Sequence, residues 1–165
     1  MRVLGLDPGS RVTGWGVIDG SGSRLAVVGF GCLRPPRTAG RPAALLSLTD
    51  AVARLVEEVR PDVVAVETSF TAKFPKAALA LAEARGALLV ALGRWGGAVV
   101  EYEPARVKAA VVGLGNADKR QVAYVVRHEL GLPESPPADA ADALALAICH
   151  LRSSGRPAAP GASVN

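Results

Sequence analysis

The chain has 165 residues, of which half are hydrophobic and 21% are charged, and its formal net charge is +4. This composition excludes a disordered or low-complexity chain, and the length fits one domain that buries enough surface to fold without a metal or a disulfide. The only two cysteines, Cys32 and Cys149, lie in apolar stretches, and we expect them to be reduced thiols. Neither a signal peptide nor an apolar run of roughly 18 residues is present, so we expect a cytoplasmic protein that is not bound to a membrane. The positive net charge favours a polyanionic partner.

Three short strands joined by turns are predicted at the start of the chain. Residues 3–6 form an apolar run that ends at the turn signal Asp7-Pro8-Gly9, and residues 13–18 and 25–33 flank a segment rich in glycine and serine. Strands joined by such short turns pair antiparallel.

Helices and two further strands are predicted after a proline-containing connector. A helix opens at Pro42 with apolar side chains at steps of three and four, and Pro61 breaks it. Residues 63–66 form an uninterrupted apolar run that reaches Glu67, as in a buried central strand. The pattern downstream predicts an alanine-rich helix, a fifth strand and three more helices at residues 77–92, 98–100, 104–112, 118–130 and 138–152.

These elements predict an α/β domain over residues 1–152, built on a five-stranded mixed sheet that is flanked by helices. The helices between the third, fourth and fifth strands are the crossovers that parallel pairing requires. Residues 153–165 are mostly Gly, Ser, Pro and Ala without periodicity, and we expect them to form a disordered C-terminal tail.

Four carboxylates stand out by their positions. Asp7 and Glu67 end predicted strands, where open α/β sheets place ligands. Asp139 and Asp142 are three residues apart at the start of the last helix, so they are neighbours on its surface beside the apolar face. A cluster of hard oxygen ligands is what Mg²⁺ or Mn²⁺ prefers, and two such ions can activate a water and stabilise the leaving oxygen of a phosphodiester.

Each of these carboxylates also has a plainer interpretation. Asp7 before Pro-Gly is compatible with simple turn chemistry, and Asp139 and Asp142 are compatible with a favourable interaction with the helix dipole. Glu67 fits a plain structural role least well, because a carboxylate at the end of a buried strand is costly to desolvate without a partner.

The segment from Leu4 to Ile18, LGLDPGSRVTGWGVI, resembles the opening of the RuvC-type Holliday-junction resolvases. The resemblance covers residues 1–152. Its further blocks are Ala65-Val66-Glu67 with Phe70 and Ala72-Lys73, Ala84-Arg85-Gly86, the stretch from Arg106 to Val122, and Ala138 to Ala145.

The resemblance implies a ribonuclease-H-like fold and a homodimer that binds four-way DNA junctions during recombination and repair. It implies two divalent ions per subunit, Mg²⁺ or Mn²⁺, held by Asp7, Glu67, Asp139 and Asp142, and paired nicks in two strands of like polarity that leave 5′-phosphate ends. It further implies that Lys108 and Lys119 serve the active site or the DNA backbone, that Phe70 stacks on a base near the crossover, and that a branch-migration motor complex is a partner.

Two positions depart from the pattern of the family. Several relatives have a polar residue after the Ala-Lys pair, where this chain has Phe74-Pro75-Lys76, so Phe74 either adds stacking or anchors the loop. Some members have histidine at the position of Asp139. Eight basic residues near the carboxylates are predicted to contact DNA: Arg11, Lys73, Lys76, Arg85, Arg106, Lys108, Lys119 and Arg120.

The alanine-rich helix at residues 77–92 is the predicted dimer interface, with Ala80 and Ala84 among the small side chains that permit close contact.

Three alternatives to the resolvase remain. A non-catalytic junction-binding module would lack at least one of the four carboxylates. An actin-like or sugar-kinase ATPase needs a second half to close over the nucleotide, and 165 residues are too few for that. A related resolvase family has a similar opening but lacks the paired aspartates. His128 and His150 lie away from the cluster, and we expect neither to be catalytic.

Overall fold

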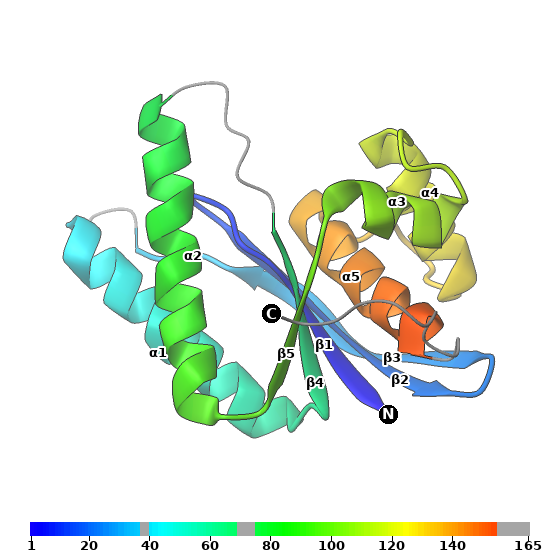
Figure 1. Cartoon of the computed structure of the whole chain (residues 1–165), viewed down its shortest axis with the longest axis horizontal. Helices are drawn as coiled ribbons and strands as arrows, with labels where there is room; N and C mark the ends of the chain where they lie inside the picture. Colours follow the sequence, from blue (N-terminus) through cyan, green and yellow to red (C-terminus); the bar gives the residue numbers. More distant parts are fainter. Residues whose placement is uncertain (37–39, 69–74, 155–165) are drawn as a thin grey trace, which may run out of the picture.

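The core of the protein is a mixed sheet of five strands, seen in a computed structural model that describes residues 1–36, 40–68 and 75–154 (Figure 1). The strand order is β3-β2-β1-β4-β5. The first three strands pair antiparallel, whereas β1 pairs parallel with β4, and β4 with β5. The strands are β1 (Arg2–Asp7), β2 (Thr13–Ser21), β3 (Arg24–Leu33), β4 (Val63–Glu67) and β5 (Ala98–Tyr102).

Helices cover both faces of this sheet. Figure 1 shows one group of helices on one side of it and a second group on the other. The first pair is α1 (Arg41–Val59) and α2 (Pro75–Trp95), and the second group is α3 (Pro104–Val112), α4 (Lys119–Glu129) and α5 (Ala138–Ser154). The predicted α/β class and five-stranded mixed sheet are confirmed, with the elements in the predicted order. No helix in the described ranges is both long and apolar enough to cross a membrane.

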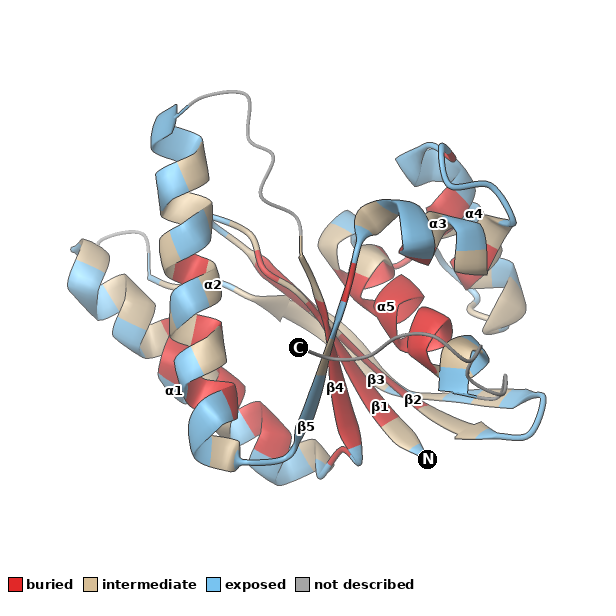
Figure 2. Ribbon diagram, viewed as in Figure 1, coloured by how far each residue is buried: buried red, intermediate tan, exposed pale blue. Residues whose placement is uncertain are grey.

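Alternation along the central strands divides the core into two clusters. On β4, Val63 and Ala65 belong to the cluster under α3, α4 and α5, while Val64 and Val66 belong to the cluster under α1 and α2. Neighbouring β1 alternates in the same way, with Val3 on the first side. Figure 2 shows buried residues on these two strands, on α5, and on parts of α1 and α2. Both strands are therefore buried on both faces, which explains their nearly continuous apolar sequences.

Helix α5 lies close to the sheet because glycines line the strands beneath it. A methyl group added to Gly5 would overlap the backbone carbonyl of Ala143, and one added to Gly14 would overlap the carbonyl of Asp139. These glycines are on neighbouring strands, since Asp7 pairs with Gly14 and Gly5 with Gly16. The obstructing atoms are backbone, so side-chain rearrangement cannot make room. Four small positions thus set the height of α5 above β1 and β2: Gly5, Gly14, Gly16 and Gly20.

We expect the substitution Gly14→Ala to destabilise the fold by about 3 kcal/mol, the upper part of the range for overpacking, because the added methyl group meets backbone. Chemical denaturation of wild-type and variant protein measures this loss. Gly29→Ala on β3 is the control, because a methyl group there would lie 3.5 Å from the Trp15 ring, an ordinary van der Waals contact. Equal stability of the wild-type and Gly14→Ala proteins would contradict the close contact.

Candidate functional site

Two carboxylates lie side by side at one edge of the sheet. Asp7 is the last residue of β1 and Glu67 the last of β4, and these strands are parallel neighbours in which Leu6 pairs with Val66. Because side chains alternate along a strand, Asp7 shares a face with Gly5, and Glu67 shares a face with Ala65. That face is the one covered by α5, so both carboxylates point toward this helix.

Helix α5 brings the other two carboxylates to the same place. Asp139 and Asp142 lie in its first two turns, and the close contact of Gly14 with the Asp139 carbonyl holds this end of the helix against β2. All four carboxylate residues are partly buried. Asp142 lines a cavity of about 210 Å³ together with Asp7 and Glu67, whereas Asp139 does not line it. Asp139 is near enough to contribute to the electrostatic environment of Asp7.

Crowding of these carboxylates changes the protonation of Asp7. Burial and the negative charges of Glu67, Asp142 and Asp139 raise the pKa of Asp7 from 3.8 to about 8, and burial is the largest cause. The positive charge of Lys119 lowers the pKa of Asp7 but does not cancel this rise. At neutral pH without a metal, Asp7 therefore carries a proton in the folded protein.

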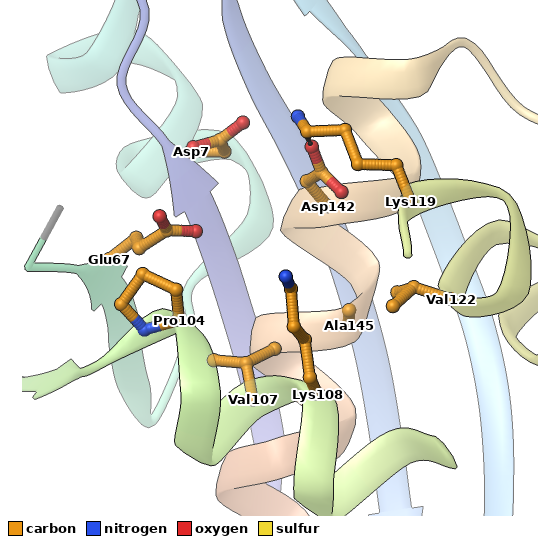
Figure 3. Close-up of a pocket in the computed structure, with 9 residues that line it drawn as sticks. All are labelled: Asp7, Glu67, Pro104, Val107, Lys108, Lys119, Val122, Asp142 and Ala145. Atoms are coloured by element: carbon orange, nitrogen blue, oxygen red, sulfur yellow. Dashed lines mark hydrogen bonds and ion pairs between the residues drawn. The ribbon is translucent and has the colours of Figure 1, made fainter. Parts of the chain in front are cut away.

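Two lysines complete the lining of the cavity (Figure 3). The Nζ of Lys119 lies 2.7 Å from Oδ2 of Asp142, and this ion pair raises the pKa of Lys119. Lys108 extends from α3 toward the space between Glu67 and Asp142 (Figure 3). The remaining wall is apolar, formed by Pro104, Val107, Val122 and Ala145.

The start of each lysine-bearing helix is fixed by its own sequence. Asp118 caps α4, because its side chain accepts a hydrogen bond from the Gln121 backbone while the Gln121 side chain accepts one from the Asp118 backbone. Lys119 is the first residue of the helix after this cap. Helix α3 opens at Pro104, whose ring favours a first helical turn.

The donor set of the site fits a hard divalent cation. Its possible ligands are carboxylate oxygens, which suit Mg²⁺ or Mn²⁺. Within the described ranges, no three His, Cys, Asp or Glu side chains are gathered closely enough to form a ready-made metal centre. This is compatible with Mg²⁺, which keeps several of its waters and needs only one or two protein carboxylates. The raised pKa of Asp7 supports the fit, because a cation would stabilise the ionised carboxylate against both burial and the repulsion of its neighbours.

The other residues predicted to bind DNA differ in accessibility. The side chains of Arg11, Lys76, Arg106 and Arg120 are exposed. The guanidinium of Arg106 lies 5.1 Å from the centre of the Tyr102 ring. Arg85 is only 12% exposed and forms an ion pair with Glu101. Phe70, Lys73 and Phe74 lie outside the described residues.

A set of hydrogen bonds that the sequence did not predict holds the residue next to Glu67. The backbone nitrogen and Oγ1 of Thr68 both donate to the carbonyl oxygen of Tyr102, at 3.0 and 3.2 Å. The buried Tyr102 hydroxyl is hydrogen-bonded to Nδ1 of His150, 2.8 Å away. His150 therefore has a structural contact far from the cavity, near the other end of α5. The sequence interpretation missed Tyr102 because it ended the fifth strand at residue 100.

Comparisons with known proteins agree on one family. The family model described as crossover junction endodeoxyribonuclease RuvC matches residues 3–150. A protein of this name from Halorhodospira halophila is 49% identical over 156 residues, covering 94% of this chain and 93% of the relative. Another from Pseudoalteromonas atlantica is 47% identical over 148 residues, covering 90% of this chain and 85% of the relative.

Solved structures show the same similarity. Thermus thermophilus RuvC in complex with a Holliday junction substrate has a TM-score of 0.86 and 33% identity, covering 93% of this chain and 94% of that one. The yeast mitochondrial Holliday junction resolvase Ydc2 has a TM-score of 0.67 at 13% identity, covering 91% and 78% of the two chains, which shows a shared fold. The predicted ribonuclease-H-like fold is thereby confirmed.

The raised pKa of Asp7 predicts how stability depends on pH in metal-free buffer. Asp7 keeps its proton up to about pH 8 in the folded protein, whereas the unfolded chain releases it near pH 3.8. The contribution of this carboxyl to the free energy of unfolding is therefore complete below pH 3.8 and is lost as the pH rises toward about 8. Asparagine does not titrate, so Asp7→Asn does not lose stability in this way. We therefore expect the Tm of the variant, relative to wild type, to rise by about 4 °C or more between pH 5 and pH 9.

Thermal denaturation with a chelator at both pH values measures this difference. Asp50→Asn is the matched control, because Asp50 is exposed on α1 and forms no ion pair with a described residue. A Tm difference between Asp7→Asn and wild type that is the same at pH 5 and pH 9 would contradict the assigned environment of Asp7.

Proposed function

Because this chain belongs to the RuvC family of crossover junction endodeoxyribonucleases, we propose that it is a metal-dependent, structure-selective endonuclease that resolves Holliday junctions by paired nicks. The main support is a cavity at the carboxyl edge of the sheet, where Asp7, Glu67 and Asp142 gather with Lys108 and Lys119. Carboxylates next to ammonium groups can serve both a divalent cation and the phosphate of a DNA strand.

Asp7, Glu67, Asp139 and Asp142 are the proposed ligands of two divalent ions per subunit, Mg²⁺ or Mn²⁺. When bound, such ions lower the pKa of a water and stabilise the charge of a phosphodiester under attack. The protein itself supplies the partly buried pocket, the fixed positions of the carboxylates at two strand ends and one helix, and two lysines that can neutralise phosphate oxygens. The start of α5 is held in place because its backbone contacts β2 directly at Gly14.

Exposed basic residues around the cavity are proposed to bind the junction arms. Arg11, Lys76, Arg106 and Arg120 present accessible charge, which is the main source of DNA affinity. Phe70 is proposed to stack on a base near the crossover, and Lys73 and Phe74, close to it in the sequence, are proposed to contact the DNA as well. Arg85 is a weaker candidate for phosphate contact, because its charge is already paired with Glu101.

The proposed homodimer forms through an exposed stripe along α2. Leu79 is 63% exposed and Val90 is 53% exposed, and the exposed Ala82, Gly86 and Gly93 lie on the same side at helical spacing. A two-fold dimer would present two sites to a junction with two-fold symmetry. The prediction that Ala84 lies at the interface is wrong. Ala84 is 3% exposed and packs in the core, so it cannot be part of the stripe.

The proposed setting of the reaction is the cytoplasm. The two cysteines of the chain are free thiols in the structure, which is consistent with work in the cytoplasm on cellular DNA. A branch-migration motor is the proposed partner, since a resolvase acts on junctions that such a motor moves.

The direct test uses a synthetic four-way junction that is end-labelled on each strand in turn. With Mg²⁺ or Mn²⁺ we expect symmetric nicks in two strands of like polarity, with ends that ligase can seal, and with a chelator we expect binding alone. Binding without nicks under all metal conditions would instead support the non-catalytic junction-binding module.

Asp7→Asn separates catalysis from binding. The substitution removes the carboxylate at the centre of the cluster while nearly keeping its shape, so we expect cleavage to fall by several orders of magnitude. Junction affinity in metal-free buffer should stay equal or become slightly tighter, because one potential negative charge facing the phosphates is removed. A cleavage time course and a gel-shift titration on the same junction measure both quantities. Asp50→Asn on α1 should change neither, and rapid cutting by Asp7→Asn would refute the assigned site.

Gly86→Arg tests the dimer. Within the part of the chain that the structure describes, no other element lies within 4 Å of a Cβ placed there, so we expect the substitution to keep the fold and to place a bulky charge in the stripe. We expect sedimentation to show a shift from dimer to monomer, with a loss of paired nicks. Glu58→Arg on the exposed face of α1 is the control for added charge. A wild-type protein that is monomeric yet makes paired nicks would exclude this arrangement.

A further inference from the structure

One ion pair in the cavity joins two helices that the core already holds together. Lys119 is the first residue of α4, and its ammonium contacts Oδ2 of Asp142 on α5 at 2.7 Å (Figure 3). Helix α4 is secured without this contact, because Val122 and Val126 are in the core and the Asp118–Gln121 capping box holds its start. The Lys119 side chain is 77% exposed, whereas Asp142 is 18% exposed. The lysine can therefore leave Asp142 without unfolding the helix.

We propose that Lys119 is a built-in counterion: its ammonium occupies the carboxylate cluster in the metal-free protein, and a divalent ion that binds there displaces it. The inference rests on the proposed function, because it assumes that these carboxylates bind metal. It assigns Lys119 a role in the protein before any DNA is bound.

The charges around Lys119 support this exchange. The ammonium interacts favourably with Asp142, Asp7 and Glu67, so it partly offsets the same repulsion that a metal would offset. A metal ion binds a carboxylate oxygen at about 2.0–2.1 Å, so an ion on the oxygen that accepts from Lys119 would lie within about 5 Å of the ammonium. Like charges this close repel, and the exposed side chain of Lys119 has room to move away. The displaced ammonium is then available to an approaching phosphate.

Lys108 provides a matched comparison in the same cavity. Its side chain also lines the cavity, but it forms no ion pair with a described carboxylate. A general effect of positive charge on metal binding would be similar for the two lysines. Displacement of an ion pair would be specific to Lys119.

The experiment measures metal affinity and stability in the absence of DNA. Calorimetric titration with Mn²⁺ gives the Kd of wild type, Lys119→Gln, Lys119→Arg and Lys108→Gln, and thermal denaturation gives the Tm of each with a chelator and with saturating Mn²⁺. We expect Lys119→Gln to bind Mn²⁺ about fivefold more tightly, which corresponds to about 1 kcal/mol. Its Tm should fall by about 2–4 °C only in the metal-free state. The two measurements must agree, because they form one thermodynamic cycle.

The remaining variants decide between exchange and a general charge effect. Lys119→Arg keeps the positive charge, and its Kd should stay within about twofold of wild type, as should that of Lys108→Gln. The proposal is overturned if Lys119→Gln binds Mn²⁺ no more tightly than wild type, if its Tm falls equally with and without Mn²⁺, or if Lys108→Gln tightens binding to the same extent. Failure of the wild-type protein to bind Mn²⁺ at all would reject the proposed metal site itself, together with this role of Lys119.

Discussion

The contact between the backbone of α5 and the backbone of the sheet is the constraint on which the site depends. Gly5 and Gly14 leave no side chain between them and the helix, so α5 rests directly on β1 and β2. This contact fixes where the start of α5 lies, and with it Asp139 and Asp142. The strand ends fix Asp7 and Glu67 independently. Four acidic residues from three elements thus reach one edge of the sheet through backbone geometry, without a loop to position any of them.

The four acidic side chains repel one another, and several groups reduce this repulsion. Asp7 takes up a proton at neutral pH, Lys119 pairs with Asp142, and Lys108 approaches from α3. Each of these arrangements is reversible, because a proton and an exposed ammonium can both leave. The metal-free site is therefore stable as folded and remains ready for a cation. A site closed by permanent ion pairs between buried arginines and carboxylates would lack this property.

Local sequence pattern predicted the elements and the acidic residues, but not the contacts between distant segments. Apolar runs and turn signals located Asp7 and Glu67 at strand ends, and the three-residue spacing placed Asp139 and Asp142 together. The direction in which Ala84 points was missed, because an alanine-rich helix has a weak apolar face and either side can be buried. The pairing of Arg85 with Glu101 and the bond from Thr68 to Tyr102 join residues of different elements, so no local pattern reveals them.

The alternation of side chains along β4 has a consequence for errors in folding. Val63, Ala65 and Glu67 face one side of the sheet, and Val64 and Val66 face the other. If β4 paired with β1 one residue out of step, Glu67 would point under α1 and α2, and every valine of the strand would change sides as well. A misplaced acid would thus be accompanied by a mispacked core on both faces. A register error that misplaces Glu67 therefore also destabilises the hydrophobic core, so a stably folded molecule has Glu67 on the correct face of the sheet.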